Sequence, residues 1–74
     1  MNVSINIKSI EEFGKNVRSV REKKRLSQEQ AAELVGIAVS YYAGIERGEE
    51  NPTFAVLRQI CVGLKIKSSD IVPF

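Results

Sequence analysis

The sequence predicts an all-α fold, a compact bundle of four to five helices, and three observations support this prediction. Apolar residues recur at intervals of three and four along most of the chain, which is the spacing of one helix face. Residues 27–48 read as two short helices joined by a tight turn, with small residues where the helices must nearly touch. A chain of 74 residues is long enough for one domain with one small hydrophobic core. We expect a single domain at residues 9–74 and an N-terminal extended arm at residues 1–8.

The N-terminal segment, residues 1–8, alternates between apolar and polar side chains, and Val3, Ile5 and Ile7 are its apolar positions. Such alternation is typical of a strand. A lone strand leaves its backbone groups unpaired, so this one would need a second strand, for example from another subunit. The alternative, which we prefer, is an extended or frayed arm.

The first helix is predicted to begin at Ser9, because Ser9 and Glu12 have the spacing of a capping box. It is expected to run to about Lys24, after which Leu26 enters the core. Its apolar stripe consists of Ile10, Phe13, Val17 and Val20. The helix also collects basic residues, which form either a solvated face or a flank that attracts nucleic acid: Lys15, Arg18, Arg21, Lys23, Lys24 and Arg25.

The second helix is expected over residues 28–35. Ser27 can cap it, and Gln30, three residues later, completes a second capping box. Ala32 is small enough for the next helix to cross close above it. Gly36 follows where the chain reverses, a position that commonly needs a positive φ angle. The residues predicted to be buried by this helix are Ala31, Leu34 and Val35.

The third helix is expected over residues 39–47, and Gly48 is well placed to end it. Ala38, at its N-cap, cannot accept hydrogen bonds from the free amides, which costs about 1 kcal/mol. Gly44 inside the helix costs about as much again relative to alanine. The apolar anchors of the helix are Ile37, Tyr42 and Ile45. Two helices joined in this way form a helix-turn-helix, whose second helix commonly lies in the major groove of DNA.

The fourth helix follows the loop of residues 49–52 and has Thr53 as its cap. A fifth, very short helix is expected after a cap at Ser68 or Ser69. It cannot extend past Val72, because Pro73 lacks an amide proton. The apolar set of the fourth helix is Phe54, Val56, Leu57, Ile60, Cys61 and Leu64.

Composition excludes several classes of function. The chain has no histidine, one cysteine and no acidic pair in a recognisable catalytic pattern, so we expect no enzyme, no metal site, no cofactor and no small-molecule ligand. Cys61 cannot form an intrachain disulfide; a buried apolar role is the simpler interpretation and a redox-sensing thiol is the alternative. No apolar run approaches the roughly 18 residues of a membrane span, and residues 1–9 lack the pattern of a signal peptide. These features predict a cytoplasmic protein.

The sequence resembles the Cro/C1-type (XRE-like) helix-turn-helix family of phage repressors and restriction–modification controller proteins. The resemblance extends from Phe13 to Val72. The matching residues are Arg21, Ser27-Gln28-Glu29, Ala32, Gly36, Ile45-Glu46-Arg47-Gly48 and Asn51-Pro52-Thr53. It implies a lambda-repressor-like DNA-binding domain in a sequence-specific transcriptional regulator, a repressor or controller. It also implies a homodimer that binds double-stranded DNA at an inverted-repeat operator, with the third helix in the major groove.

The resemblance carries roles onto individual residues. It implies an ion pair of Arg21 with Glu46, which makes Arg21 structural and not a DNA ligand. Gln28 opens the second helix and is expected to contact phosphate with its side chain and the free amide there. The full set of expected phosphate ligands is Lys23, Gln28, Arg47, Asn51 and Thr53.

Base-reading positions fall at the start of the third helix and one turn later. In this sequence the expected base-reading residues are Val39, Ser40, Tyr41, Ala43 and Gly44. These positions depart from the family pattern, because arginine, glutamine and asparagine, which discriminate bases strongly, are absent. We therefore expect weak direct readout of the bases. Recognition then relies on DNA shape, or the DNA-reading role is lost.

Apolar residues also crowd the C-terminal end of the chain. Leu64 and Ile71 are expected to close the core, whereas the expected dimer interface consists of Ile66, Val72 and Phe74. The alternative function is a protein-binding module of the same fold, such as a toxin-neutralising antitoxin. The apolar face formed by Val39, Ala43 and Gly44 favours that alternative.

Overall fold

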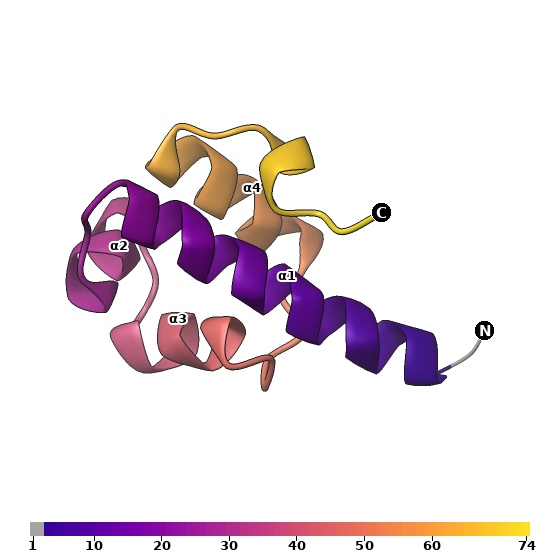
Figure 1. The fold of residues 1–74 in the computed structure, drawn as a ribbon. Helices are drawn as coiled ribbons and strands as arrows, with labels where there is room; N and C mark the ends of the chain where they lie inside the picture. Colours follow the sequence, from indigo (N-terminus) through magenta and orange to yellow (C-terminus); the bar gives the residue numbers. More distant parts are fainter. Residues whose placement is uncertain (1–2) are drawn as a thin grey trace.

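Helices make up most of the structure, a computed structural model that describes the backbone of residues 3–74 and the side chains of residues 8–74. The elements are α1 (Val3–Lys23), α2 (Gln28–Val35), α3 (Val39–Glu46), α4 (Phe54–Leu64) and the short 3-10 helix η1 (Ser68–Asp70) (Figure 1). The described backbone contains no strand. This arrangement confirms the predicted all-α fold class. Within the described residues, no helix combines the length and the apolar character needed to cross a membrane.

The start of α1 corrects the sequence prediction. The helix begins at Val3 and not at Ser9, so the extended arm is wrong for residues 3–8, while residues 1 and 2 lie outside the described residues. The chain contains neither proline nor glycine before Gly14, and a nucleated helix gains one hydrogen bond for each residue that it adds. A helix also satisfies these backbone groups within the segment itself, whereas a strand would need a partner.

Local signals set the boundaries of the shorter helices. The Oγ atom of Ser27 accepts a hydrogen bond from the backbone N–H of Gln30 at 3.0 Å, and the Gln30 side chain accepts one from the Ser27 N–H at 2.8 Å. These two bonds are the predicted capping box. Gly36 ends α2 in the left-handed conformation, with a φ of 85°. Thr53 caps α4 by accepting a hydrogen bond from the Val56 amide at 3.2 Å, whereas α3 has no side-chain cap.

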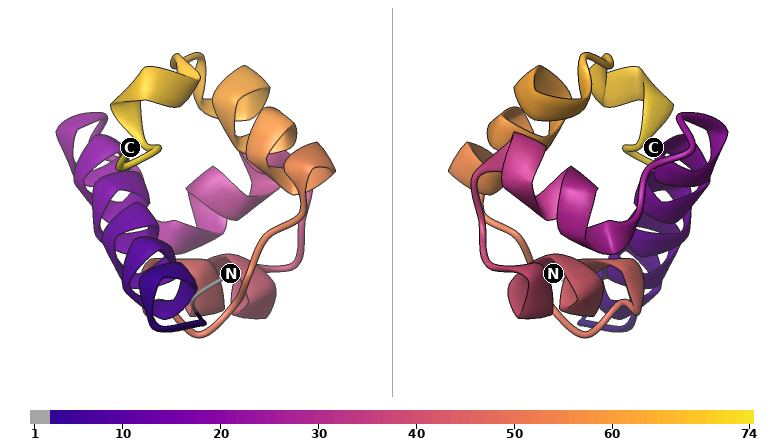
Figure 2. Two further views of the ribbon diagram at one scale, coloured as in Figure 1. Left: turned by 90° about the vertical axis from the view of Figure 1, so that its right-hand side faces the viewer. Right: turned by 90° about the vertical axis from the view of Figure 1, so that its left-hand side faces the viewer.

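The helices enclose one hydrophobic core. Figure 2 shows α1, α3, α4 and the C-terminal segment around a common centre. In the packing, α1 contacts α3, and α2 contacts both α3 and α4. The Asn16 side chain donates a hydrogen bond to the carbonyl of Ile71 at 3.0 Å, which ties the C-terminal segment to α1. The largest fully buried side chains are Val17, Tyr42, Ile45, Ile60 and Ile71.

Two glycines inside helices mark places where backbones meet without side chains between them. A Cβ atom on Gly14 would lie 2.8 Å from the carbonyl oxygen of Glu46, where α1 crosses α3. A Cβ atom on Gly63 would lie 2.6 Å from the carbonyl oxygen of Leu34, where α4 crosses α2. Cβ atoms do not approach backbone atoms this closely, so these two crossings require glycine.

Leu34 corrects a prediction for α2. It was expected to be buried, but 54% of its surface is exposed, whereas Ala31, Ala32 and Val35 are buried. The backbone of α2 contacts α4 directly at Gly63, so the inward face of this short helix is narrow and accommodates small residues. Leu34 lies at the edge of that face and contributes apolar surface.

Candidate nucleic-acid interface

A buried ion pair joins α1 to the end of α3. The guanidinium of Arg21 donates from Nε to Glu46 Oε2 at 2.7 Å and from Nη2 to Glu46 Oε1 at 3.0 Å. Its third nitrogen, Nη1, donates to the carbonyl of Leu26 at 2.9 Å, which holds the loop before α2. Arg21 is thus committed to internal contacts, and the structure contains the ion pair that the family resemblance implies.

Burial and hydrogen bonding act in opposite directions on the Glu46 carboxylate. Only 7% of Glu46 is exposed, and burial by itself opposes ionisation. The hydrogen bonds from Arg21 and Gln28 outweigh that effect and hold the pKa of Glu46 below its usual value. The hydrogen bond to Glu46 raises the pKa of Arg21, so the pair stays ionised at neutral pH. Burial raises the pKa of the neighbouring Tyr42. The Tyr42 hydroxyl is fully buried, and no described atom lies in a position to form a hydrogen bond with it.

The first turn of α2 presents free hydrogen-bond donors. The first N–H groups of a helix have no intrahelical acceptor, and the Ser27 hydroxyl takes up only the one from Gln30. The backbone N–H groups of Gln28 and Glu29 remain, at the positive end of the helix dipole. The Gln28 side chain is half-buried and donates from Nε2 to Glu46 Oε1 at 3.1 Å. Sequence reasoning did not foresee this last bond.

The surface of α3 differs from the sequence prediction at two of five expected base-reading positions. Val39 and Ser40 are exposed and Tyr41 is half-buried, so all three can reach a ligand. Ala43 and Gly44 are buried, so they lack the exposed surface that a base-reading residue needs. Gly44 is covered by the side chain of Glu50, whose Cγ atom would lie 2.8 Å from a Cβ atom on Gly44.

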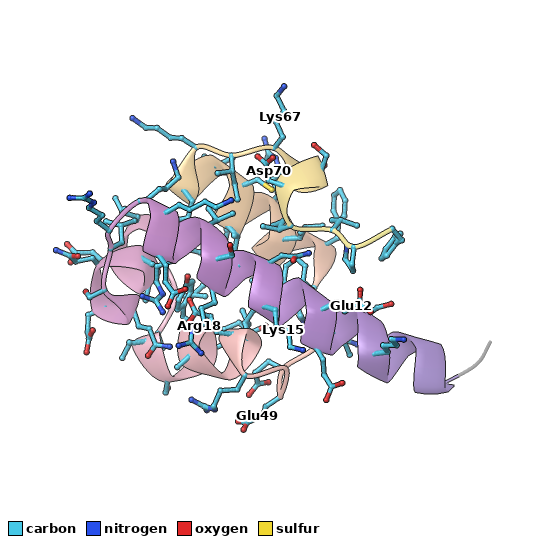
Figure 3. The ribbon with its side chains drawn as sticks, viewed as in Figure 1. Glu12, Lys15, Arg18, Glu49, Lys67 and Asp70 are labelled. Atoms are coloured by element: carbon cyan, nitrogen blue, oxygen red, sulfur yellow. The ribbon has the colours of Figure 1, made fainter. Side chains whose placement is uncertain are left out.

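The other expected phosphate ligands all lie on the surface. Lys23, Arg47, Asn51 and Thr53 are exposed, although the Thr53 hydroxyl oxygen is already the acceptor that caps α4. Arg47 donates from Nη2 to Glu49 Oε1 at 2.9 Å. That hydrogen bond raises the pKa of Arg47 and lowers the pKa of Glu49. Figure 3 shows Glu49 at the outer edge of the loop after α3, on the opposite side of the molecule from Asp70.

The residues expected to form a dimer interface differ in exposure. Ile66 and Val72 are half-buried against the core, while 95% of Phe74 is exposed. Leu64 and Ile71 are buried, as expected for residues that close the core. Sequence reasoning missed Phe54, which is 82% exposed although it belongs to the apolar set of the fourth helix. It is the first residue of α4, where a side chain can point away from the core without breaking the apolar spacing.

An open groove of about 580 Å³ lies between α1, the start of α4 and the C-terminal segment. Its apolar lining residues are Ile10, Phe13, Pro52, Phe54, Leu57, Val72, Pro73 and Phe74. The groove therefore has an exposed aromatic residue from each of two segments, Phe54 and Phe74, at its border. A surface that combines apolar projections with an apolar hollow can bind a copy of itself.

The chain is similar to a known protein family and to several named proteins. Residues 17–71 match the family described as helix-turn-helix (HTH_3). The immunity repressor protein of Bacillus phage phi105 is 36% identical over 59 residues, which are 80% of this chain and 41% of the repressor. The control protein C.SmaI of Serratia marcescens is 43% identical over 53 residues, 72% of this chain and 61% of that protein. The chain thus spans less than two thirds of the length of these two relatives.

Solved structures of helix-turn-helix regulators have a similar fold. The restriction-modification controller protein C.AhdI from Aeromonas hydrophila superimposes with a TM-score of 0.81 and 34% identity, over 84% of this chain and 94% of that one. An HTH_3 family transcriptional regulator from Vibrio cholerae superimposes with a TM-score of 0.86 and 29% identity. That match covers 89% of this chain and 37% of the Vibrio protein.

Proposed function

The chain belongs to the helix-turn-helix family HTH_3, whose members regulate transcription by binding DNA, and from this premise we propose a sequence-specific operator-binding function. In this proposal a homodimer binds an inverted-repeat operator, as a repressor or a controller, with α3 of each copy in the major groove. One helix-turn-helix reads only a few base pairs, so two copies on half-sites about one helical turn apart provide a longer recognition sequence.

The first turn of α2 is the observation that carries this proposal. It combines two free backbone N–H groups with the Gln28 side chain, beside the Arg21–Glu46 pair that links α2 and α3 to α1. A phosphate oxygen at this turn would receive several hydrogen bonds and the favourable end of the helix dipole. Such a contact fixes the position of the protein on the duplex without selecting its sequence. Lys23, Arg47, Asn51 and Thr53 supply the flanking contacts.

Base reading in this proposal rests on the exposed start of α3. Val39 is suited to contact with a thymine methyl group, and Ser40 can donate or accept a hydrogen bond at a base edge. The hydroxyl of Tyr41 reaches a base or a phosphate. Because none of these side chains makes a bidentate contact, sequence-dependent DNA shape supplies much of the specificity.

We assign dimerisation to the groove face, which carries Phe54 and Phe74 beside the half-buried Val72. Ile66, the other residue expected at the interface, is half-buried against the core and does not line the groove. Both aromatic side chains are almost fully exposed in the single chain, and their burial would remove a large apolar area from water. Phe54 thus extends the interface expected from the sequence toward the start of α4.

Selection from a randomised duplex pool, followed by sequencing and fluorescence anisotropy, tests the operator-binding function. We expect enrichment of an inverted repeat and an affinity that falls steeply as the salt concentration rises. Gln28→Ala should weaken binding to all duplexes about equally, whereas Ser40→Ala should change the preferred sequence. Absence of any enriched sequence would contradict the proposal.

The alternative function, a protein-binding module such as a toxin-neutralising antitoxin, draws on exposed apolar surface. Burial of Ala43 and Gly44 removes two of the three residues that favoured it, so that Val39 alone remains on α3. The observation that favours it is the exposed apolar surface of Leu34 and Val62, which are 54% and 67% exposed and line one shallow hollow between α2 and α4. Co-purification of a partner protein by a chain that enriches no duplex would support this alternative.

A further inference from the structure

The Glu46 carboxylate accepts hydrogen bonds from side chains on two other elements. Two come from Arg21 on α1, at 2.7 and 3.0 Å, and one comes from Gln28 on α2, at 3.1 Å. The Oε1 atom of Glu46 is shared between Arg21 Nη2 and Gln28 Nε2. The buried ion pair therefore extends directly to the side chain that opens the candidate phosphate site.

The acceptor determines which end of the Gln28 amide faces inward. A carboxylate only accepts hydrogen bonds, so it selects the amide nitrogen and excludes the amide oxygen from this contact. The nitrogen carries two N–H donors, and the bond to Glu46 uses one of them. The second remains for an outside acceptor, in an orientation that the planar amide fixes.

Charge balance at this point also matters for DNA binding. An ionised carboxylate one hydrogen bond away from a phosphate ligand would repel the phosphate. The bidentate contact with Arg21 offsets that charge, and Arg21 is itself held by the carbonyl of Leu26. The pair thus supplies an acceptor for Gln28 without presenting a net negative charge to DNA.

We propose that Glu46, balanced by Arg21, is a positioning residue for phosphate binding, because it holds the Gln28 amide with its free N–H group directed at the DNA backbone. This inference rests on the proposed operator-binding function. It adds that the ion pair contributes to DNA affinity and not only to folding.

A double-mutant cycle on DNA affinity tests this inference, with Gln28→Ala measured in the wild-type and in the Glu46→Gln background. Glu46→Gln has the same shape but one oxygen in place of two, so Arg21 and Gln28 must compete for it. We expect Gln28→Ala to weaken binding of the selected duplex about tenfold in the wild-type background, the loss of one hydrogen bond to a charged group. In the Glu46→Gln background the same change should weaken binding less than about threefold.

The matched control is Glu22→Gln, which removes the exposed ion pair between Arg18 and Glu22 on α1. In that background Gln28→Ala should retain its full effect. An equal effect of Gln28→Ala in the wild-type and Glu46→Gln backgrounds would overturn the positioning role while leaving operator binding intact. No effect of Gln28→Ala in any background would overturn the phosphate contact and the positioning role together.

Folding failure of Glu46→Gln is covered by a second variant and a second measurement. Glu46→Asp keeps the charge but draws the acceptor away from Gln28, and it should reduce the effect of Gln28→Ala in the same way. In the wild-type protein, NMR relaxation of the side-chain amides should show Gln28 more rigid than the exposed Gln59. Equal mobility of the two amides would contradict the positioning role.

Discussion

The Glu46 carboxylate makes stability depend on pH. Its pKa in the folded chain lies below the ordinary value, so the unfolded chain takes up the proton first as the pH falls. The stabilisation is complete above the unfolded pKa of roughly 4.3 and is lost as the pH falls through the lower folded pKa. We expect the unfolding free energy of the wild type to fall more steeply below about pH 5 than that of Glu46→Gln. Urea unfolding followed by circular dichroism measures both curves.

The matched control for this prediction is again Glu22→Gln, because Glu22 forms an exposed ion pair that contributes little to stability. Below about pH 5, the unfolding free energy of Glu22→Gln should fall as steeply as that of the wild type. At neutral pH, Glu46→Gln should cost about 3 kcal/mol, since it leaves a largely buried guanidinium without its counter-charge. Parallel curves for wild type and Glu46→Gln would show that the pair does not drive the pH dependence.

The exposed pair of Arg47 and Glu49 lies beside the proposed DNA surface. In the free chain the Glu49 carboxylate pairs with the Arg47 guanidinium, which we propose binds a DNA phosphate. A phosphate must therefore displace the Glu49 carboxylate. Glu49→Gln should therefore raise the affinity for the selected duplex several-fold, most at low salt. Anisotropy titrations give the affinities. Asp70→Asn, on the opposite side of the molecule (Figure 3), should leave the affinity unchanged, and an equal gain from both changes would indicate a general charge effect.

At this scale the sequence indicated some contacts and not others. The Arg21–Glu46 pair followed from the family resemblance, and the capping box of α2 depends on Ser27 and Gln30, only three positions apart. The cover of Glu50 over Gly44 depends on how the loop after α3 folds back. The bond from Gln28 to Glu46 joins residues that are 18 positions apart in the chain. No local sequence pattern predicts the contact of Glu50 with Gly44 or the bond from Gln28 to Glu46.

Close helix crossings are the element-scale feature on which the position of α3 depends. Gly14→Ala should lower the unfolding free energy by about 1–3 kcal/mol, although alanine is the better helix former, because its Cβ would collide with the backbone of α3. Ser19→Ala, an exposed change on the same helix, should be neutral or slightly stabilising. Chemical unfolding of both variants measures the difference. A stabilised Gly14→Ala would mean that α1 and α3 lie farther apart than described.

The elements themselves were predictable where a local signal marked their ends. Ser27 with Gln30, Gly36 and Thr53 determine the boundaries of α2 and α4, and each is found in the expected role. The capping pattern at Ser9 predicts too late a start for α1, because no proline or glycine precedes it and the helix begins at Val3. The exposure of Leu34 was also missed, since it depends on the crossing of α2 with α4 and not on spacing within α2.

At the scale of the whole molecule, the proposed homodimer forms through the groove face. Phe54→Asp should raise the dimer dissociation constant more than tenfold, because it places a charge in an apolar contact. Sedimentation of the protein without DNA measures the constant. Val39→Asp is the matched control, since Val39 is an exposed apolar residue on α3. A dimer that resists Phe54→Asp would exclude the groove face as its interface.

The central claim is that the start of α2 and the exposed start of α3 bind DNA. An NMR titration of isotope-labelled protein with the selected duplex tests it most directly, because each backbone amide reports on its own surroundings. We predict the largest shifts at the amides of Gln28, Glu29, Val39 and Ser40, and small shifts at η1. Shifts concentrated in α4 and the C-terminal segment, with the first turn of α2 unchanged, would contradict the account.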